Sequence, residues 1–174
     1  IAWSNNPAWC LYDLLTNDRY GLGDYISTDL VDKWSLYTIG KYCDQEVPSG
    51  HGTGLLEPRF TCNMYIQSRE DAFKVINDMA SVFRGMVYWS SGNLTAIQDS
   101  SQDATFMFNP SNVVDGIFTY SGASQKARHT VALVSWNDMS DMCRQKIEYV
   151  EDAESISKYG IIETEIVAIG CTSR

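Results

Sequence analysis

The fold is decided by residues 68–89, which read SREDAFKVINDMASVFRGMVYW. Ser68 stands three residues before Asp71, a spacing close to that of a capping box at a helix start. Apolar residues then recur at steps of three and four and form one face: Ala72, Phe73, Val75, Ile76, Met79, Ala80 and Phe83. A face of this width is typical of a helix that packs in the middle of a core. We therefore expect a central helix from Ser68 to Arg84, ended by Gly85.

Strands are expected on both sides of this helix. Upstream, the alternation of apolar and polar side chains predicts a strand from Arg59 to Gln67. Downstream, residues 86–89 and 94–98 are rich in apolar side chains, and the turn-forming residues 90–93 separate them, which predicts a hairpin. The expected order around the central helix is therefore strand, helix, strand, strand.

Two further helices are expected before this region. Asn6-Pro7 suits the cap and first turn of one helix, whose apolar stripe ends near Asn17. A second stripe begins near Ser27 or Thr28 and fades towards Pro48. Residues 48–58 contain three glycines and are interpreted as a flexible loop.

The C-terminal part is expected to be rich in strands. Its predicted elements are strands at Val113–Tyr120, Thr130–Trp136, Gln145–Val150 and Ile161–Ile169, and a short helix at Asp152–Tyr159. The predicted class is α+β, with two N-terminal helices followed by a mixed strand region with a packed central helix and a short C-terminal helix. We expect residues 1–58 to form a helical segment with its Gly-rich loop, and residues 59–174 to form an α+β domain.

Charge and hydropathy exclude two classes of partner. The chain has 174 residues and a formal net charge of −9. Binding to nucleic acid needs clustered Lys and Arg, so specific nucleic-acid binding is not expected. No apolar run approaches the roughly 20 residues that cross a bilayer, so membrane insertion is not expected either.

The cysteines are odd in number and widely spaced: Cys10, Cys43, Cys62, Cys143 and Cys171. Disulfide frameworks and zinc sites usually show closer, paired spacing. We therefore expect five reduced thiols, most of them buried as small hydrophobic groups. This interpretation fits synthesis in a reducing cytoplasm.

No group of residues indicates an active site. The glycine-rich residues 50–54 follow a helix and lead into a strand, which is the wrong context for a phosphate-binding loop. His51 and His129 both lie in predicted loops, without a nucleophile motif beside them. The late carboxylates are typical of a solvated face and a helix start: Glu148, Glu151, Asp152 and Glu154. We expect no catalytic residue, no cofactor and no metal, and hence no enzyme.

The aromatic content indicates an interface. The chain contains five Trp and ten Tyr. We expect core packing to take most of them, and a buried role for Trp9 and Tyr12 is an alternative to an interface role. Trp and Tyr are favoured anchors in protein interfaces, and Trp3, Trp9 and Tyr12 are the best candidates. Carbohydrate-binding modules are also rich in aromatic residues, so a sugar-binding module is an alternative.

Long stretches of the chain carry a family resemblance. They are NPAWCLYDLLTNDRYGLG at 6–23, EPRFTCNMYI at 57–66, FRGMVYW at 83–89, NVVDGIFTYS at 112–121, VSWND at 134–138 and GCTSR at 170–174. In this order, and over nearly the whole chain, they resemble the tail tip attachment proteins of lambda-type bacteriophages and prophages, the host specificity protein J family.

The resemblance implies a structural role. Members of the family form a trimeric hub at the end of the tail, which joins the tail tube to the central fibre and surrounds the path of the tape measure protein and the genome. The implied location is the virion tail tip, after synthesis in the host cytoplasm. The implied partners are further copies of the chain, other tail proteins and the tape measure protein. The chain is expected to be a fragment that lacks the family's C-terminal receptor-binding part. The alternative is a cell-envelope glycosidase or sugar-binding module of the tail tip.

Overall fold

The computed structural model of the chain describes residues 3–50, 54–67, 70–101, 103–124 and 127–174. The chain divides into two compact units, each described by itself. The first unit comprises Ile1–Asp99, Ser135–Glu148 and Val167–Arg174. The second comprises Ser100–Val134 and Tyr149–Ile166. The predicted division of the chain at residues 58 and 59 stays a prediction.

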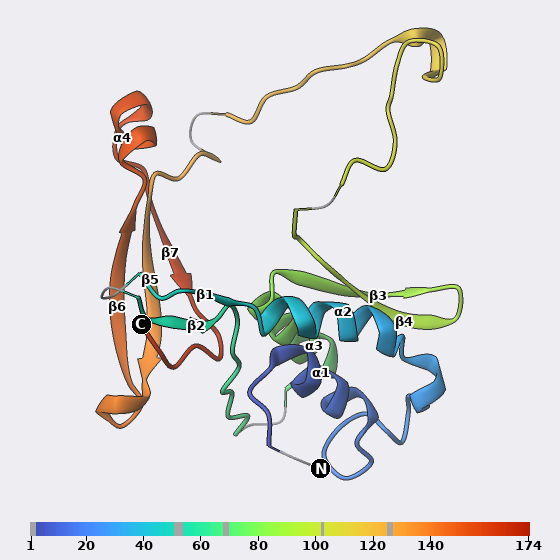
Figure 1. Ribbon diagram of the computed structural model, residues 1–174, viewed down its shortest axis with the longest axis vertical. Helices are drawn as coiled ribbons and strands as arrows, with labels where there is room; N and C mark the ends of the chain where they lie inside the picture. Colours follow the sequence, from blue (N-terminus) through green and yellow to red (C-terminus); the bar gives the residue numbers. More distant parts are fainter. Residues whose placement is uncertain (1–2, 51–53, 68–69, 102, 125–126) are drawn as a thin grey trace. The chain divides into compact units, whose positions relative to one another are not determined.

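Two N-terminal helices begin the first unit, α1 (Pro7–Thr16) and α2 (Lys33–Cys43) (Figure 1). The Asn6 side chain accepts a hydrogen bond of 3.0 Å from the amide of Ala8, so the predicted start of α1 is confirmed. The second helix begins later than predicted, because Asp32 caps it by accepting from the amides of Trp34 and Ser35. A separate 3₁₀ turn, Thr28–Leu30, precedes it.

The central helix α3 (Ala72–Val82) is shorter than predicted. Ser68 lies outside the described residues, and Asp71 caps the helix by accepting from the amides of Phe73 and Lys74 at 2.9 and 3.2 Å. The buried side chains lie in the last turns and just beyond them, where Phe83 is 0% exposed. Phe73 is 72% exposed, so the prediction that it packs in the core is wrong. Neighbouring elements cover only the later turns of the apolar stripe.

The predicted hairpin is confirmed as β3 (Gly85–Ser90) paired antiparallel with β4 (Asn93–Gln98). Its two turn residues, Ser91 and Gly92, both have positive φ, as tight hairpin turns require. The core of the first unit joins this hairpin to all three helices. Its buried members are Ala8, Leu11, Leu15, Val31, Leu36, Ile39, Cys43, Met79, Ala80, Phe83, Leu94 and Ala96.

The region between α2 and α3 departs from two predictions. The ends of the predicted loop are the short antiparallel strands β1 (Glu46–Pro48) and β2 (Leu56–Pro58). The strand predicted from Arg59 to Gln67 is wrong. Successive amides there bond to different parts of the unit, Cys62 to the carbonyl of Asn5 at 2.7 Å and Asn63 to that of Gly170 at 2.9 Å. Residues 59–67 therefore form an irregular stretch bonded to several parts of the unit, although their apolar and polar side chains alternate.

Three strands form a sheet in the order β6 (Arg144–Glu151), β5 (Val131–Asp138) and β7 (Glu163–Val167). All three predicted strands exist, and the last is shorter at both ends. The predicted short helix is α4 (Ala153–Tyr159), capped by Asp152 and ended by Gly160 at φ +78°. In the second unit, the buried Thr130 hydroxyl donates to the Gly160 carbonyl and accepts from the Ile162 amide, both at 2.9 Å.

Residues 103–124, called here the extended segment, contain only one 3₁₀ turn, Val114–Gly116 (yellow in Figure 1). The strand predicted from Val113 to Tyr120 is therefore wrong. A local turn is nevertheless organised, because Asn112 donates to the Met107 carbonyl at 2.9 Å and accepts from the Asn109 amide at 2.8 Å.

Candidate functional site

The predicted interface residues lie near the start of the first unit but in different environments. Trp3 is 83% exposed. Trp9 is partly buried, and a side chain at Gly40 of α2 would meet its ring at 3.4 Å. Tyr12 is also partly buried and packs against the core. Their use as interface anchors stays a prediction, for which the exposure of Trp3 is the most favourable.

Trp9 belongs to an aromatic cluster that the sequence analysis did not single out. Its ring lies 6.4 Å from that of Tyr37, whose ring in turn lies 6.2 Å from the exposed Trp34. The ammonium groups of Lys33 and Lys41 lie 6.0 Å from the Trp34 ring and 5.7 Å from the Tyr37 ring. The spacing of three between Trp34 and Tyr37 in an expected helix was the available signal for this cluster.

The extended segment exposes the densest run of large apolar side chains in the second unit. These are Phe106, Met107, Phe108, Val114, Ile117, Phe118 and Tyr120. The rings of Phe106 and Phe108 meet edge to face at 4.9 Å, and those of Phe118 and Tyr120 lie 6.5 Å apart. Large apolar side chains that gather at an exposed surface are characteristic of protein contact sites.

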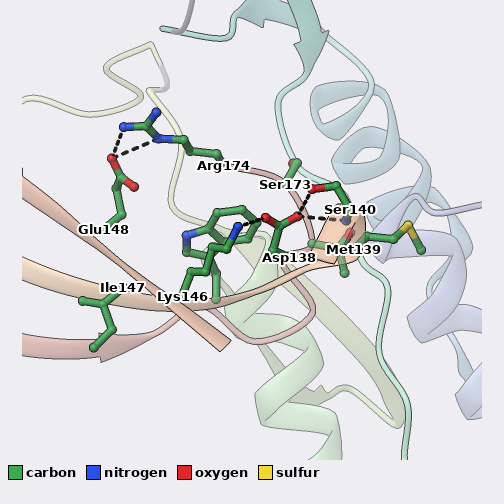
Figure 2. Close-up of a pocket in the computed structure, with 10 residues that line it drawn as sticks. Asp138, Met139, Ser140, Lys146, Ile147, Glu148, Ser173 and Arg174 are labelled. Carbon is green, nitrogen blue, oxygen red and sulfur yellow. Dashed lines mark hydrogen bonds and ion pairs between the residues drawn. The ribbon is translucent and has the colours of Figure 1, made fainter. Parts of the chain in front are cut away.

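The first unit contains a cavity of about 860 Å³ beside β5 and β6 (Figure 2). Two ion pairs line it. Asp138 accepts from the ammonium of Lys146 and from the hydroxyl of Ser140 at 2.6 Å. Glu148 accepts from the Arg174 guanidinium at 2.6 and 3.1 Å. The other lining residues are Trp136, Met139, Ile147, Thr172 and Ser173.

The two carboxylates in this cavity form ion pairs with neighbouring cations. The Lys146 ammonium, followed by the Ser140 hydroxyl, lowers the pKa of Asp138 to about 2. Asp138 is therefore ionised at neutral pH and cannot act as the protonated carboxylic acid that glycoside hydrolysis needs. Glu148 forms an ion pair with the guanidinium of Arg174. The two ion pairs therefore join β6 to β5 and to Arg174.

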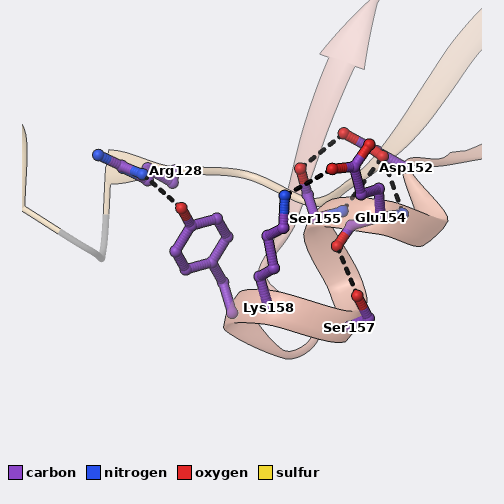
Figure 3. Close-up of polar contacts among 7 residues, drawn as sticks. Arg128, Asp152, Glu154, Ser155, Ser157 and Lys158 are labelled. Carbon is purple, nitrogen blue, oxygen red and sulfur yellow. Dashed lines mark hydrogen bonds and ion pairs between the residues drawn. The ribbon is translucent and has the colours of Figure 1, made fainter.

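Two of the other carboxylates considered for catalysis, Asp152 and Glu154, organise α4 in the second unit (Figure 3). Asp152 accepts from the Ser155 hydroxyl at 2.6 Å and from the amides of Ser155 and Glu154 at 3.2 and 3.1 Å. These contacts, the Ser155 hydroxyl foremost, lower the pKa of Asp152. Glu154 accepts from Lys158 one turn later at 2.5 Å. The exposure of these groups and their use in helix capping indicate a structural role.

Arg128 connects the chain before β5 to the end of α4. Its guanidinium donates to the Tyr159 hydroxyl at 2.9 Å and lies 5.1 Å from the Tyr159 ring (Figure 3). This contact forms a small polar cluster on the surface of the second unit.

The remaining features to locate are the two histidines, a metal site and a membrane-spanning helix. His51 lies outside the described residues, and His129 is exposed. Among the residues that the structure describes, no group of three or more His, Cys, Asp or Glu side chains is placed to hold a metal ion. In the same residues, no helix combines the length and apolar character needed to cross a membrane.

Comparison with protein families places the chain in a class. Residues 71–174 match a family described as "Putative phage tail protein". The chain therefore belongs to this phage tail protein family. The match covers α3, the hairpin and all of the second unit.

Two relatives carry a more particular name. The Tip attachment protein J of Escherichia phage SECphi27 is 45% identical over 173 residues, which is 99% of this chain and 14% of the relative. The Tip attachment protein J of Escherichia phage SECphi4 is 36% identical over 172 residues, which is 98% of this chain and 15% of the relative. The resemblance expected from the sequence is thus confirmed, and the chain spans about one-seventh of the length of these relatives.

Proposed function

We propose that the chain is a structural segment of a phage tail tip, built into a trimeric hub together with other tail proteins. The extended segment carries the proposal. Four aromatic and three aliphatic side chains are exposed there, and aromatic side chains bury about 150–250 Å² each on contact. Because these side chains are partly exposed already, the segment offers an area of the same order as the roughly 800 Å² that each partner buries in a stable interface.

Family membership supports the same role. Relatives named tip attachment proteins contain a segment homologous to nearly the entire chain. We infer that the chain lies in the virion tail tip after synthesis in the host cytoplasm. The proposed partners are further copies of the chain, proteins of the tail tube and the tape measure protein. The net charge of −9 suits a surface past which a genome slides without binding.

The proposed role is not enzymatic. In the large cavity, Asp138 and Glu148 are each paired with a cation. The lowered pKa of Asp138 prevents it from serving as the protonated acid that glycoside hydrolysis needs. Zymography on peptidoglycan and envelope polysaccharide tests this inference. We expect no clearing, and clearing that Glu148→Gln or Glu151→Gln abolishes would overturn it.

Imaging of a longer protein that contains this chain tests the hub itself. Electron microscopy is expected to show a three-fold assembly with the chain inside it. A monomeric longer protein would contradict the hub, and binding of a defined oligosaccharide in the cavity would favour the sugar-binding alternative.

A further inference from the structure

Two of the five cysteines lie together in the first unit. Cys10 is in the second turn of α1, and Cys62 is in the irregular segment that follows β2. Both line one cavity of about 320 Å³. The carbonyls of two consecutive residues hold the backbones of both cysteines. The Cys10 amide donates to the Asn6 carbonyl at 3.0 Å, and the Cys62 amide donates to the Asn5 carbonyl at 2.7 Å. The 51 residues between them in the sequence concealed this pairing.

The two thiols differ in acidity because they interact with each other. A hydrogen bond from the Cys62 thiol lowers the pKa of Cys10 to about 7, although burial and the Asp13 carboxylate act in the opposite direction. The same contact, together with burial, raises the pKa of Cys62. The lowered pKa increases the share of Cys10 that is thiolate near neutral pH, and the thiolate is the nucleophilic form of cysteine.

The other cysteines lack this combination. Cys43 is fully buried, and burial raises its pKa to about 12. The Cys171 thiol donates to the Ser173 carbonyl at 3.1 Å. Cys143 is exposed in the turn before β6. Cys10 is thus the thiol in which a lowered pKa, partial access to solvent and a neighbouring thiol coincide.

We propose that Cys10 and Cys62 form a peroxide-sensitive dithiol that closes to an intrachain disulfide. The Cys10 thiolate attacks one peroxide oxygen, the O–O bond breaks, and the departing hydroxide takes up a proton to leave as water. Cys10 becomes a sulfenic acid. Cys62 then loses its proton and attacks the Cys10 sulfur, and the S–O bond breaks as a second water leaves. The peroxide accepts the two electrons that the two thiols lose.

The disulfide would fasten α1 to the segment after β2. The biological setting rests on the proposed tail function, since a virion protein leaves the reducing cytoplasm in which disulfides do not persist. The chemistry itself is measured on the isolated chain. Failure of the tail function therefore leaves this test unchanged, and failure of the dithiol leaves the tail function standing.

Peptide mass spectrometry without reductant tests the bond directly. Each cysteine lies in a different tryptic peptide, with Cys10 in residues 1–19 and Cys62 in residues 60–69. After treatment of the folded chain with hydrogen peroxide, we expect these two peptides to be linked in most molecules. The Cys143→Ser variant should give the same product. Free or separately oxidised Cys10 and Cys62 peptides, or links chiefly to Cys143 or Cys171, would overturn the proposal.

The pH dependence of alkylation provides a second readout that does not require the bond to form. Cys10 should react with iodoacetamide with a midpoint near pH 7. Cys62→Ala removes the hydrogen-bond donor and should raise this midpoint, whereas Cys62→Ser keeps a donor and should raise it less. Identical midpoints in the wild type and Cys62→Ala would show that the two thiols do not interact.

Discussion

The helical part of the first unit and the extended segment use apolar residues in opposite ways. In α1 and α2, large apolar side chains such as Leu11, Leu15 and Leu36 are buried within the chain itself. In the extended segment, side chains of similar size are exposed, and Tyr120 is 90% exposed. Burial of the first set stabilises the fold, whereas the second set is left exposed by the chain itself. We therefore propose that the first set holds the chain together and that the second set joins it to an assembly.

The largest expected effect tests the buried side of this comparison. Phe83→Ala should lower the free energy of unfolding by about 3–5 kcal/mol, because it leaves a cavity among the core side chains after α3. The matched control is Phe73→Ala in the first turn of α3, which should cost less than about 0.5 kcal/mol because Phe73 is exposed. Urea denaturation of both variants measures the difference. Equal costs would show that the first turn of α3 is as well covered as its end.

A smaller effect is expected at a helix end. Asp32→Ala removes the acceptor for two amides at the start of α2 and should cost about 1 kcal/mol in the same experiment. Asp29→Ala, in the preceding 3₁₀ turn, is the control and should change stability by less than about 0.5 kcal/mol. If the two substitutions cost the same, the cap does not set the start of this helix.

The ion pair in the large cavity predicts a modest dependence on pH. The pKa of Asp138 is about 2 in the folded chain, against an ordinary value of 3.8. Its stabilising effect is therefore complete above about pH 4 and is lost as the pH falls towards 2. The unfolding midpoints of the wild type and Asp138→Asn should converge over this range, and Lys146→Met should behave like Asp138→Asn. A difference that does not change with pH would contradict the ion pair.

The parts of the fold that were predicted correctly depend on local signals. Asn6-Pro7 and Asp152 mark helix starts, Gly160 marks a helix end, and Ser91-Gly92 form a hairpin turn. Each of these signals acts within a few residues, so the sequence contains it completely.

The wrong predictions depended on partners that a single sequence does not reveal. Residues 59–67 and 113–120 show strand-like patterns, yet strands require a neighbouring strand, and none pairs with them among the described residues. Phe73 continues an apolar stripe beyond the point where other elements cover it. The pairing of Cys10 with Cys62 likewise depends on distant contacts. Of the candidate sites, the sequence indicated Trp3 and Trp9, whereas the exposure of residues 106–108 required the structure.

The central claim is that the extended segment is an assembly surface and contributes little to the fold. Light scattering of the chain over a range of concentration and salt tests it most directly. The wild type should self-associate weakly, and more strongly as salt screens the charge of −9.

The double substitution Phe106→Ser with Phe108→Ser should abolish this association while changing the free energy of unfolding by less than about 0.5 kcal/mol. Leu55→Ser with Leu56→Ser, an exposed apolar pair in the first unit, is the matched control and should associate as the wild type does. A wild type that is monomeric at high concentration and high salt, or a Phe106→Ser, Phe108→Ser variant that associates unchanged, would contradict the account.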